Sequence, residues 1–215
     1  MRKEYFAADL EQVFLKERSD SGLFITITGF DGSGKTTQIE AMANEFRKRN
    51  KDVLVTAQPN DWFRNQPINR HYLEHGGTEI QARILALMAA AARLVHVHDV
   101  ILPALNEGKV VICDRYVHAA FAVFLHRGID SKFLADINEG LPRPDYSFYL
   151  SVPPETLIQR LNHRDKGNLK YEERKIERIT SIIHTYEQMG SQLIKIDGIQ
   201  EADQVTNSIM KHIKF

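Results

Sequence analysis

A glycine-rich segment followed by a lysine and two threonines is the most chemically suggestive stretch of this sequence. "GFDGSGKTTQ" fits the pattern G-x-x-x-x-G-K-[ST] and follows the apolar run "LFITIT". Glycines let the backbone turn so that successive N–H groups point at one anion, and the helix expected after them adds its positive dipole end. The segment therefore predicts a binding loop for a nucleoside triphosphate. Its expected contacts are Gly29, Phe30, Asp31, Gly32, Ser33, Gly34, Lys35, Thr36 and Thr37.

Two of these residues have distinct expected roles. Lys35 supplies a mobile positive charge for the outer phosphates, and the Thr36 hydroxyl is suited to ligate Mg²⁺. A second charged pair, Asp114 and Arg115, ends the apolar run "VVIC". Ligands bind at the carboxyl ends of strands in open α/β sheets, so a carboxylate there suits Mg²⁺ and a guanidinium suits a phosphate.

A basic segment, "RLNHRDKGNLKYEERK", contains Arg164, Lys166 and Lys170 around a glycine. We interpret residues 163–174 as a lid that closes over the triphosphate, excludes water and brings positive charge to the transferring group. Arg164 and Lys166 are therefore expected to act in catalysis. A solvated charged face is the alternative interpretation of the same pattern.

The elements that position these residues follow from hydrophobic patterning. Five short runs, each near-continuously apolar at its centre, read as strands buried on both faces. They are residues 23–29, 52–57, 109–113, 145–151 and 192–197. Amphipathic helical patterns separate them, which predicts an α/β fold: a five-stranded parallel sheet with helices on both faces.

Two further segments lie outside this alternation. Residues 78–105 are apolar nearly all round and predict a long, largely buried helix. Residues 5–17 are amphipathic and predict a helix within an N-terminal extension over residues 1–20. With no linker or internal repeat in the sequence, residues 1–215 are expected to form a single domain.

Composition restricts the classes of partner. The 215 residues hold 28 basic and 28 acidic side chains, so the chain lacks the net positive charge typical of proteins that bind nucleic acid or anionic membranes. Uncharged runs reach only about ten residues, short of a membrane span. The single cysteine, Cys113, excludes an internal disulfide, and the N-terminus lacks the pattern of a signal peptide. We therefore expect a cytoplasmic protein.

From about Leu23 to the C-terminus the chain resembles the thymidylate kinases, P-loop enzymes that phosphorylate dTMP with ATP. The resemblance rests on "GFDGSGKTTQ", "ARLVHVHDVILPAL", "VVICDRY", "HRGID", "YLSVPPE" and "HRDKGNLKYE", which occur in family order. It implies a five-stranded parallel sheet, ATP and Mg²⁺ as cofactors, nucleotide substrates and a homodimer.

The resemblance also implies roles for single residues. Asp31 would approach the acceptor's 3′-hydroxyl and the reacting phosphates, Arg93 would bind the base, and Arg115 would bind the acceptor phosphate. Thr36 and Asp114 would organise the metal ion.

The acceptor pocket departs from the family pattern. Ala89 stands where the family has a phenylalanine that stacks on thymine, Val123 replaces a tyrosine that crowds the sugar 2′-position, and Phe124 replaces a polar residue. These changes lead to the hypothesis of a roomier pocket that takes another monophosphate or a modified base, with Phe124 among its substrate contacts. The sequence thus predicts an ATP-dependent nucleoside-monophosphate kinase, with dTMP as the first candidate acceptor.

Two alternatives remain at this stage. A deoxynucleoside kinase would need a carboxylate base near the end of the second strand, where the sequence offers Asp61, a few residues late. A nucleotide-binding module without turnover is the other. The changed acceptor pocket favours it, whereas the retained Lys35, Thr36, Asp114, Arg115 and lid cations count against it.

Overall fold

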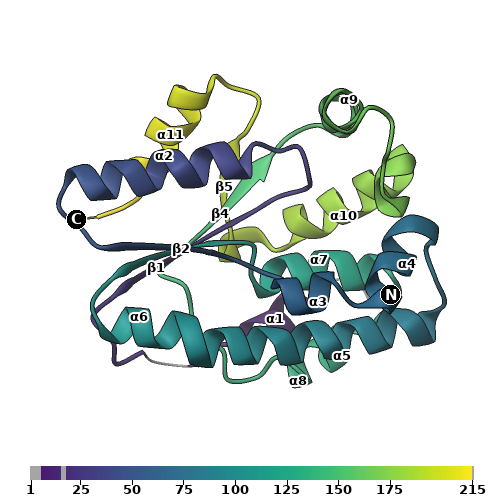
Figure 1. Ribbon diagram of the computed structural model, residues 1–215, viewed down its shortest axis with the longest axis horizontal. Coiled ribbons are helices and arrows are strands. Elements are labelled where there is room, and N and C mark those ends of the chain that lie inside the picture. The colour runs from purple at the N-terminus through teal and green to yellow at the C-terminus, as the bar shows by residue number, and fades with distance from the viewer. Residues whose placement is uncertain (1–5, 16–17, 215) are drawn as a thin grey trace.

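The computed structural model of the chain describes residues 6–15 and 18–214 and contains the predicted parallel sheet. The strands are β1 (Leu23–Thr28), β2 (Val53–Ala57), β3 (Val110–Asp114), β4 (Tyr146–Ser151) and β5 (Ile194–Asp197). They lie in the order β2-β3-β1-β4-β5, and every neighbouring pair is parallel (Figure 1). Because parallel strands end at one edge of the sheet, the residues that follow β1, β2 and β3 meet there.

Helices cover both faces of the sheet. The α-helices are α1 (Phe6–Gln12), α2 (Lys35–Lys48), α3 (Asp61–Arg64), α4 (Pro67–His75), α5 (Glu79–His96), α6 (Leu102–Asn106), α7 (Val117–His126), α8 (Ser131–Asp136), α9 (Pro154–Asp165), α10 (Ile176–Gln188) and α11 (Ala202–Met210). A π-helical turn η1 (Val97–Ile101) and two 3₁₀ turns, η2 (Tyr171–Arg174) and η3 (Gly190–Gln192), complete the described elements.

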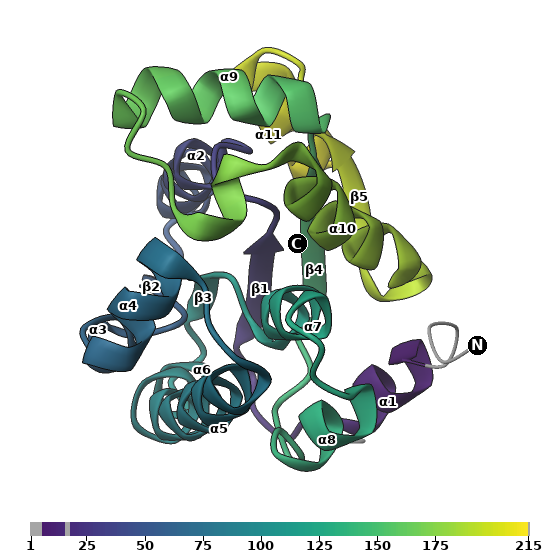
Figure 2. The same cartoon turned by 90° about the vertical axis from the view of Figure 1, so that its right-hand side faces the viewer.

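Two apolar cores explain this layering. On one face, α2 and α11 pack on β1, β3, β4 and β5 through Met42, Phe46 and Ile209 among others. The opposite face is covered by a larger core that includes α1, α5, α7 and α10 (Figures 1 and 2). Alternate residues of β1 face opposite cores, with Phe24 in the larger and Ile25 in the smaller. The inner strands β1, β3 and β4 are largely buried on both faces, as their apolar runs predicted. For β2 and β5 that expectation is wrong, because they are the edge strands of the sheet and are only partly buried.

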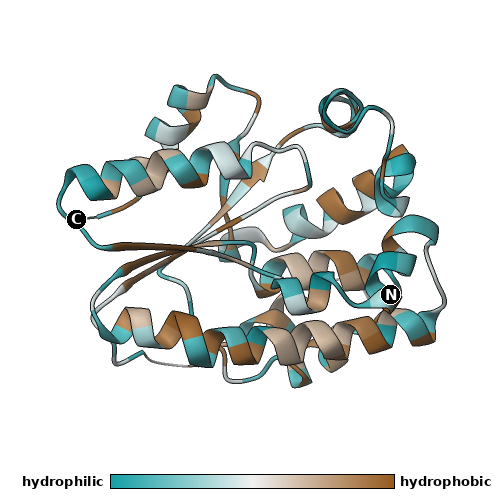
Figure 3. Cartoon of the chain, in the orientation of Figure 1, coloured by the Kyte–Doolittle hydropathy of each residue, from teal (hydrophilic) through white to brown (hydrophobic). Residues whose placement is uncertain are grey.

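The helix predicted over 78–105 forms, but one of its faces is not buried. It begins with a capping box in which the Thr78 hydroxyl accepts from the Gln81 backbone N–H, and it continues through η1 and α6. The expectation of a largely buried helix is wrong for a stripe whose members are 40–73% exposed: Ile80, Ile84, Leu87, Leu94 and Val95. Apolar residues are visible along this helix in Figure 3. The periodicity of apolar residues cannot distinguish a helix face that is buried within the chain from an apolar face that stays exposed on its surface.

Within residues 6–15 and 18–214, one helix, Glu79–Asn106, is long and apolar enough to cross a membrane by length and composition alone. Within this fold, however, 44% of its most apolar window is buried against the rest of the chain. It also carries the buried Arg93, whose side chain is hydrogen-bonded inside the protein. These are features of the core helix of a globular fold, and such a helix is weak evidence for a membrane span.

The described residues 6–14 of the N-terminal extension contribute to the larger core. Leu10 and Val13 are fully buried, and the ring of Phe14 stacks 6.5 Å from that of Tyr116. The Asp9 carboxylate accepts a hydrogen bond from the Ser131 hydroxyl, which ties α1 to α8. The helix predicted over 5–17 ends earlier, at Gln12, and the positions 5, 16 and 17 lie outside the described residues.

Candidate active site

The predicted phosphate loop connects β1 to α2, as the motif requires. Gly29, Gly32 and Gly34 have φ values of 149°, 83° and 95°, a region that residues with a side chain rarely adopt. A Cβ atom added to Gly29 would also lie 2.7 Å from the Ser33 hydroxyl oxygen. The glycines are therefore needed for the turn that brings the loop to the N-terminus of α2, where backbone N–H groups favour an anion.

Lys35 is the first residue of α2 and is buried at the base of this loop. Its Nζ donates to the carbonyl oxygens of Gly29 (3.2 Å) and Phe30 (3.0 Å). Burial, and next the positive charge of Arg115, lower the pKa of Lys35 to about 8. A triphosphate placed in the loop would raise the pKa of Lys35 again, because anionic oxygens stabilise the ammonium group.

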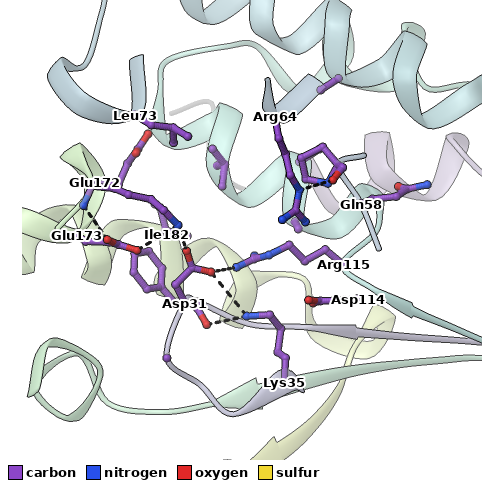
Figure 4. Close-up of a pocket in the computed structure, with 18 of the residues that line it drawn as sticks. Asp31, Lys35, Gln58, Arg64, Leu73, Asp114, Arg115, Glu172, Glu173 and Ile182 are labelled. Carbon is purple, nitrogen blue, oxygen red and sulfur yellow. Dashed lines mark hydrogen bonds and ion pairs between the residues drawn. The ribbon is translucent and has the colours of Figure 1, made fainter. Parts of the chain in front are cut away.

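Asp31 is the centre of a cluster of positive charges (Figure 4). Its carboxylate accepts from the Arg115 guanidinium and from Lys170 Nζ at 2.6 Å, and Lys35 Nζ lies 3.9 Å away. Burial alone would raise the pKa of Asp31, but the three cations hold it well below the usual range. The cluster therefore has three positive charges around one ionised carboxylate. This excess of positive charge is suited to bind the phosphate groups of two ligands that meet at Asp31.

The end of β3 positions Arg115 and Asp114. Arg115 has φ of 66°, and its backbone N–H donates to the Ile27 carbonyl at 2.8 Å, which turns the chain and directs the guanidinium toward Asp31. Among the described residues, Asp114 Oδ1 is buried without a hydrogen-bond partner. This buried oxygen lies beside the phosphate loop and has no protein donor. It is therefore suited to accept a hydrogen bond from a water molecule that is bound to a divalent cation.

The basic segment partly follows the prediction. Helix α9 extends to Asp165, and the chain then turns through Gly167 into η2. Lys170 and Arg164 line the same cavity as the phosphate loop, and Arg164 pairs with Asp165 at 2.6 Å. Lys166, predicted to be catalytic, is exposed and does not line the cavity. The described geometry brings Lys170 to Asp31 instead, because Lys166 sits at the left-handed turn that ends α9.

Arg93, on α5, lines the same cavity as the phosphate loop. Its Nε donates to Gln58 Oε1 at 3.1 Å, and Nη1 donates to Asn138 Oδ1. Burial lowers the pKa of Arg93 to about 10, so the guanidinium stays charged at neutral pH. Ala89 and Val123 line the cavity too. Arg93 can therefore offer hydrogen bonds to a ligand placed between these walls.

Aromatic side chains still line the cavity despite Ala89. Phe124 from α7 is among them, as expected, and Phe63 from α3 is a second aromatic wall that the sequence analysis did not assign. The described structure buries Phe63 (5% exposed) because Asn60 caps α3 and turns the residue inward.

Three charged wall residues were also missed. Arg64 Nε donates to the Pro59 carbonyl at 2.6 Å, and its guanidinium extends toward the same space as Arg115 (Figure 4). Arg127 and Glu172 form an ion pair at 2.5 Å, almost fully buried, that joins α7 to η2. The sequence signal for Arg64 was its position in "WFR", a few residues after the second strand, at the edge of the sheet where ligands bind. Arg127 and Glu172 are 45 residues apart, so no local pattern pairs them.

Together these residues line one cavity of about 690 Å³ that runs from the phosphate loop to Arg93. That volume lies within the usual range for small-molecule sites. Asp61, the candidate base for a deoxynucleoside kinase, begins α3 with an exposed side chain and is not part of the wall. Among the described residues, no cluster of three or more His, Cys, Asp or Glu side chains could hold a metal ion. A metal here would need oxygen ligands from the nucleotide.

Comparison with known proteins gives a consistent result. Residues 27–209 match the family model described as thymidylate kinase. A protein of Pyrococcus horikoshii described as "Probable thymidylate kinase" is 35% identical over 199 residues, which cover 90% of this chain and 96% of that protein. Proteins named "Thymidylate kinase" from Acholeplasma laidlawii and Bacillus licheniformis are 32% and 30% identical, over 89% and 90% of this chain and 98% and 93% of their own lengths.

Proposed function

Because this chain belongs to the thymidylate kinase family, we propose that it transfers the γ-phosphoryl group of Mg·ATP to a nucleoside monophosphate, with dTMP as its acceptor. The observation that supports this most is the charge cluster in which Lys35, Arg115 and Lys170 converge on Asp31. It lies in the same cavity as the phosphate loop and Arg93. Donor and acceptor phosphates would therefore meet where the positive charge is concentrated.

In this reaction an oxygen of the acceptor phosphate attacks the γ-phosphorus in line. The attacking phosphate is already ionised, so the transfer needs no general base, and positioning and charge neutralisation supply most of the catalysis. Lys35 would stabilise the transferring group, Arg115 would orient the acceptor phosphate, and Arg64 at the rim is suited to assist it. Lys170 already pairs with Asp31, and closure of the lid would add Arg164 and exclude water.

Mg²⁺ would be held by the Thr36 hydroxyl and, through water, by Asp114, whose unpartnered buried oxygen supports this assignment. When bound, the ion supplies positive charge between the phosphates of ATP. Asp31 has a different role in the proposal. Its three cations keep it ionised and fixed in place, so it can accept a hydrogen bond from the sugar 3′-hydroxyl.

We also propose that the whole chain acts as one domain in the cytoplasm and that two copies associate through α5. The exposed stripe of Ile80, Ile84, Leu87, Leu94 and Val95 supports this assembly, because exposed apolar residues that recur on one helix face are typical of protein interfaces. An isologous contact between two copies would bury the stripe on both.

Release of ADP, measured with ATP and each of a panel of monophosphates and nucleosides, tests the function. We expect turnover with dTMP and none with thymidine. Lys35→Ala should lower kcat about a hundredfold or more, since it removes a charge that acts on the transition state. Lys48→Ala, on the exposed end of the same helix, is the matched control and should leave kcat unchanged.

The same panel tests the hypothesis of a roomier acceptor pocket. If dTMP exceeds every other monophosphate in kcat/KM by about a hundredfold, the pocket is selective and that hypothesis is wrong. ATP binding without turnover of any acceptor would instead support the nucleotide-binding module.

A further inference from the structure

A chain of buried hydrogen bonds runs from β2 to Arg93 and includes a histidine that has no role in the proposed reaction. His96 Nε2 lies 2.7 Å from the Thr56 hydroxyl oxygen, and His96 Nδ1 lies 3.0 Å from Gln58 Nε2. Gln58 Oε1 then accepts from Arg93 Nε at 3.1 Å. Gln58, Arg93 and His96 are 2%, 5% and 8% exposed, so bulk water contributes little to these contacts.

The proton positions in this chain follow from the donors available. A guanidinium has donors and no acceptor, so Gln58 must present its carbonyl oxygen to Arg93 and its NH₂ group to His96. His96 Nδ1 must then be the acceptor, which places the single proton of the neutral ring on Nε2, donating to Thr56. The opposite tautomer would set an N–H of His96 against the NH₂ group of Gln58.

The charge on the ring is restricted in the same way. A second proton on His96 would occupy Nδ1 and remove the acceptor for Gln58. Burial lowers the pKa of His96, which agrees with a neutral ring. If Gln58 turned its amide to relieve the conflict, its NH₂ group would face the guanidinium of Arg93, and that hydrogen bond would be lost.

Arg93 is thereby held from two sides. Gln58 occupies Nε, and Asn138 accepts from Nη1 while its own Nδ2 donates to the Leu134 carbonyl at 2.7 Å. The guanidinium forms part of the cavity wall, and Nη2 remains as the nitrogen with no assigned partner among the described residues. A donor fixed in this way can donate to a carbonyl on the edge of a base, whereas an amino group in the same place would set one donor against another.

We propose that His96 is a positioning residue: together with Thr56 and Gln58 it fixes the guanidinium of Arg93, and so it sets the preference of the acceptor pocket for a base with a carbonyl rather than an amino group at that edge. This inference rests on the proposed function, because it takes the base of the acceptor to lie against Arg93. Selectivity for the base then depends on Thr56 and His96, which do not line the cavity, as well as on the residues of the cavity wall.

The first experiment examines the ring without any substrate. Two-bond ¹H–¹⁵N correlation spectra of the full chain with labelled histidine, assigned by the loss of one signal in His96→Asn, report which ring nitrogen carries the proton. We expect a neutral ring protonated at Nε2 at pH 7. A ring protonated at Nδ1, or at both nitrogens, would overturn the inference whatever the protein phosphorylates.

The second experiment compares dTMP with 5-methyl-dCMP, which differs only in the amino group and the unprotonated N3 on the edge of the base. The wild-type chain should favour dTMP by about ten- to a hundredfold in kcat/KM, the range for a buried hydrogen bond to a charged donor. His96→Leu should raise the KM for dTMP about tenfold and reduce the preference for dTMP by a similar factor. The KM for ATP and kcat with saturating dTMP should change little.

His96→Asn is the conservative variant, because its side-chain oxygen can replace Nδ1 as the acceptor for Gln58. It should recover most of the preference for dTMP that His96→Leu loses. An unchanged KM and preference in folded His96→Leu would overturn the inference, as would equal losses in both variants.

Thr56→Val serves if His96→Leu does not fold. It removes the acceptor for Nε2 and frees the ring to adopt the other tautomer, so a smaller loss of the same preference is expected, and no loss would overturn the inference. Failure of the proposed function is distinguishable, since a wild-type chain with no dTMP turnover contradicts that function while the histidine spectra still decide the arrangement of the ring.

Discussion

At the scale of the residue, Lys35 shows how catalysis and stability oppose each other. Its ammonium group is only 7% exposed, and its hydrogen-bond acceptors are two backbone carbonyls of the phosphate loop. In the free protein this charge is destabilising, because burial and Arg115 lower its pKa from 10.5 to about 8. The site keeps a costly charge that becomes favourable once a phosphate binds.

We predict that Lys35→Met stabilises the free protein at pH 7. The shift corresponds to roughly 3 kcal/mol, and the lost contacts to the loop carbonyls offset part of it, so a gain of about 1–2 kcal/mol in the free energy of unfolding is expected. Between pH 8 and 10.5 the unfolded chain holds this proton and the folded chain does not. The stability of the wild type relative to Lys35→Met should therefore rise through that window.

Urea unfolding of both proteins at pH 7 and at pH 10 measures the difference. A variant that is less stable than the wild type at pH 7 would contradict the prediction. Lys48→Met, an exposed lysine on the same helix, controls for the loss of a surface charge.

At the scale of the element, the ion pair between Arg127 and Glu172 connects the end of α7 with η2. The two side chains are 6% and 9% exposed, and Arg127 also lies over the rings of Tyr72 (4.3 Å) and Phe124 (5.3 Å). Gly76, after α4, leaves space for Tyr171, since a Cβ there would lie 2.5 Å from its ring. The lid is thus attached to the acceptor side of the cavity by packing and by a buried charge pair.

We predict that Arg127→Met loosens the lid. The variant leaves the Glu172 carboxylate buried without its partner, which typically costs about 3–5 kcal/mol. Hydrogen exchange of the backbone over residues 168–174 should become faster, and the KM for dTMP should rise.

The double variant Arg127→Met, Glu172→Leu should recover part of the stability, since an apolar pair replaces the ionic one. Lys132→Met, which removes an exposed ion pair on α8, should leave exchange in the lid unchanged. Equal exchange in wild type and Arg127→Met would show that the pair does not hold the lid.

Helix α1 provides a second test at this scale. We predict that Leu10→Ala destabilises the protein by about 2–5 kcal/mol, because Leu10 is fully buried in the core shared with α8. Thermal unfolding measures this cost, with the exposed Gln12→Ala as the control. A loss below about 0.5 kcal/mol would mean that α1 is a dispensable attachment rather than part of the fold.

At the scale of the whole molecule, the exposed stripe of α5 predicts the assembly. We expect light scattering on the purified chain to give twice the mass of one chain, and Leu87→Glu to give the mass of one, because a charge placed in an apolar interface is costly to bury. Ile199→Glu, at an exposed apolar residue elsewhere, should leave the dimer intact. A monomeric wild type would contradict the proposed assembly, and a dimeric Leu87→Glu would exclude this interface.

The sequence by itself determined the local features of this protein. Strands buried on both faces appear as continuous apolar runs, and the phosphate loop depends on glycines and a lysine at fixed spacing, so neighbouring residues contain all the information needed. For the same reason the loop position of Asp31 and Thr36 and the strand-end position of Asp114 and Arg115 could be predicted before the fold was known, and all four residues line the cavity. The thymidylate kinase family followed from these motifs in order.

Tertiary structure alone decided which distant residues meet. Lys170 rather than Lys166 reaches Asp31 because the turn after α9 points one side chain inward and the other outward. Arg127 pairs with Glu172, and His96 reaches Arg93 through Gln58, across separations that no local period encodes. The exposed face of α5 was also decided by the tertiary structure, because the burial of a helix face depends on what packs against it and not on the sequence pattern of the helix.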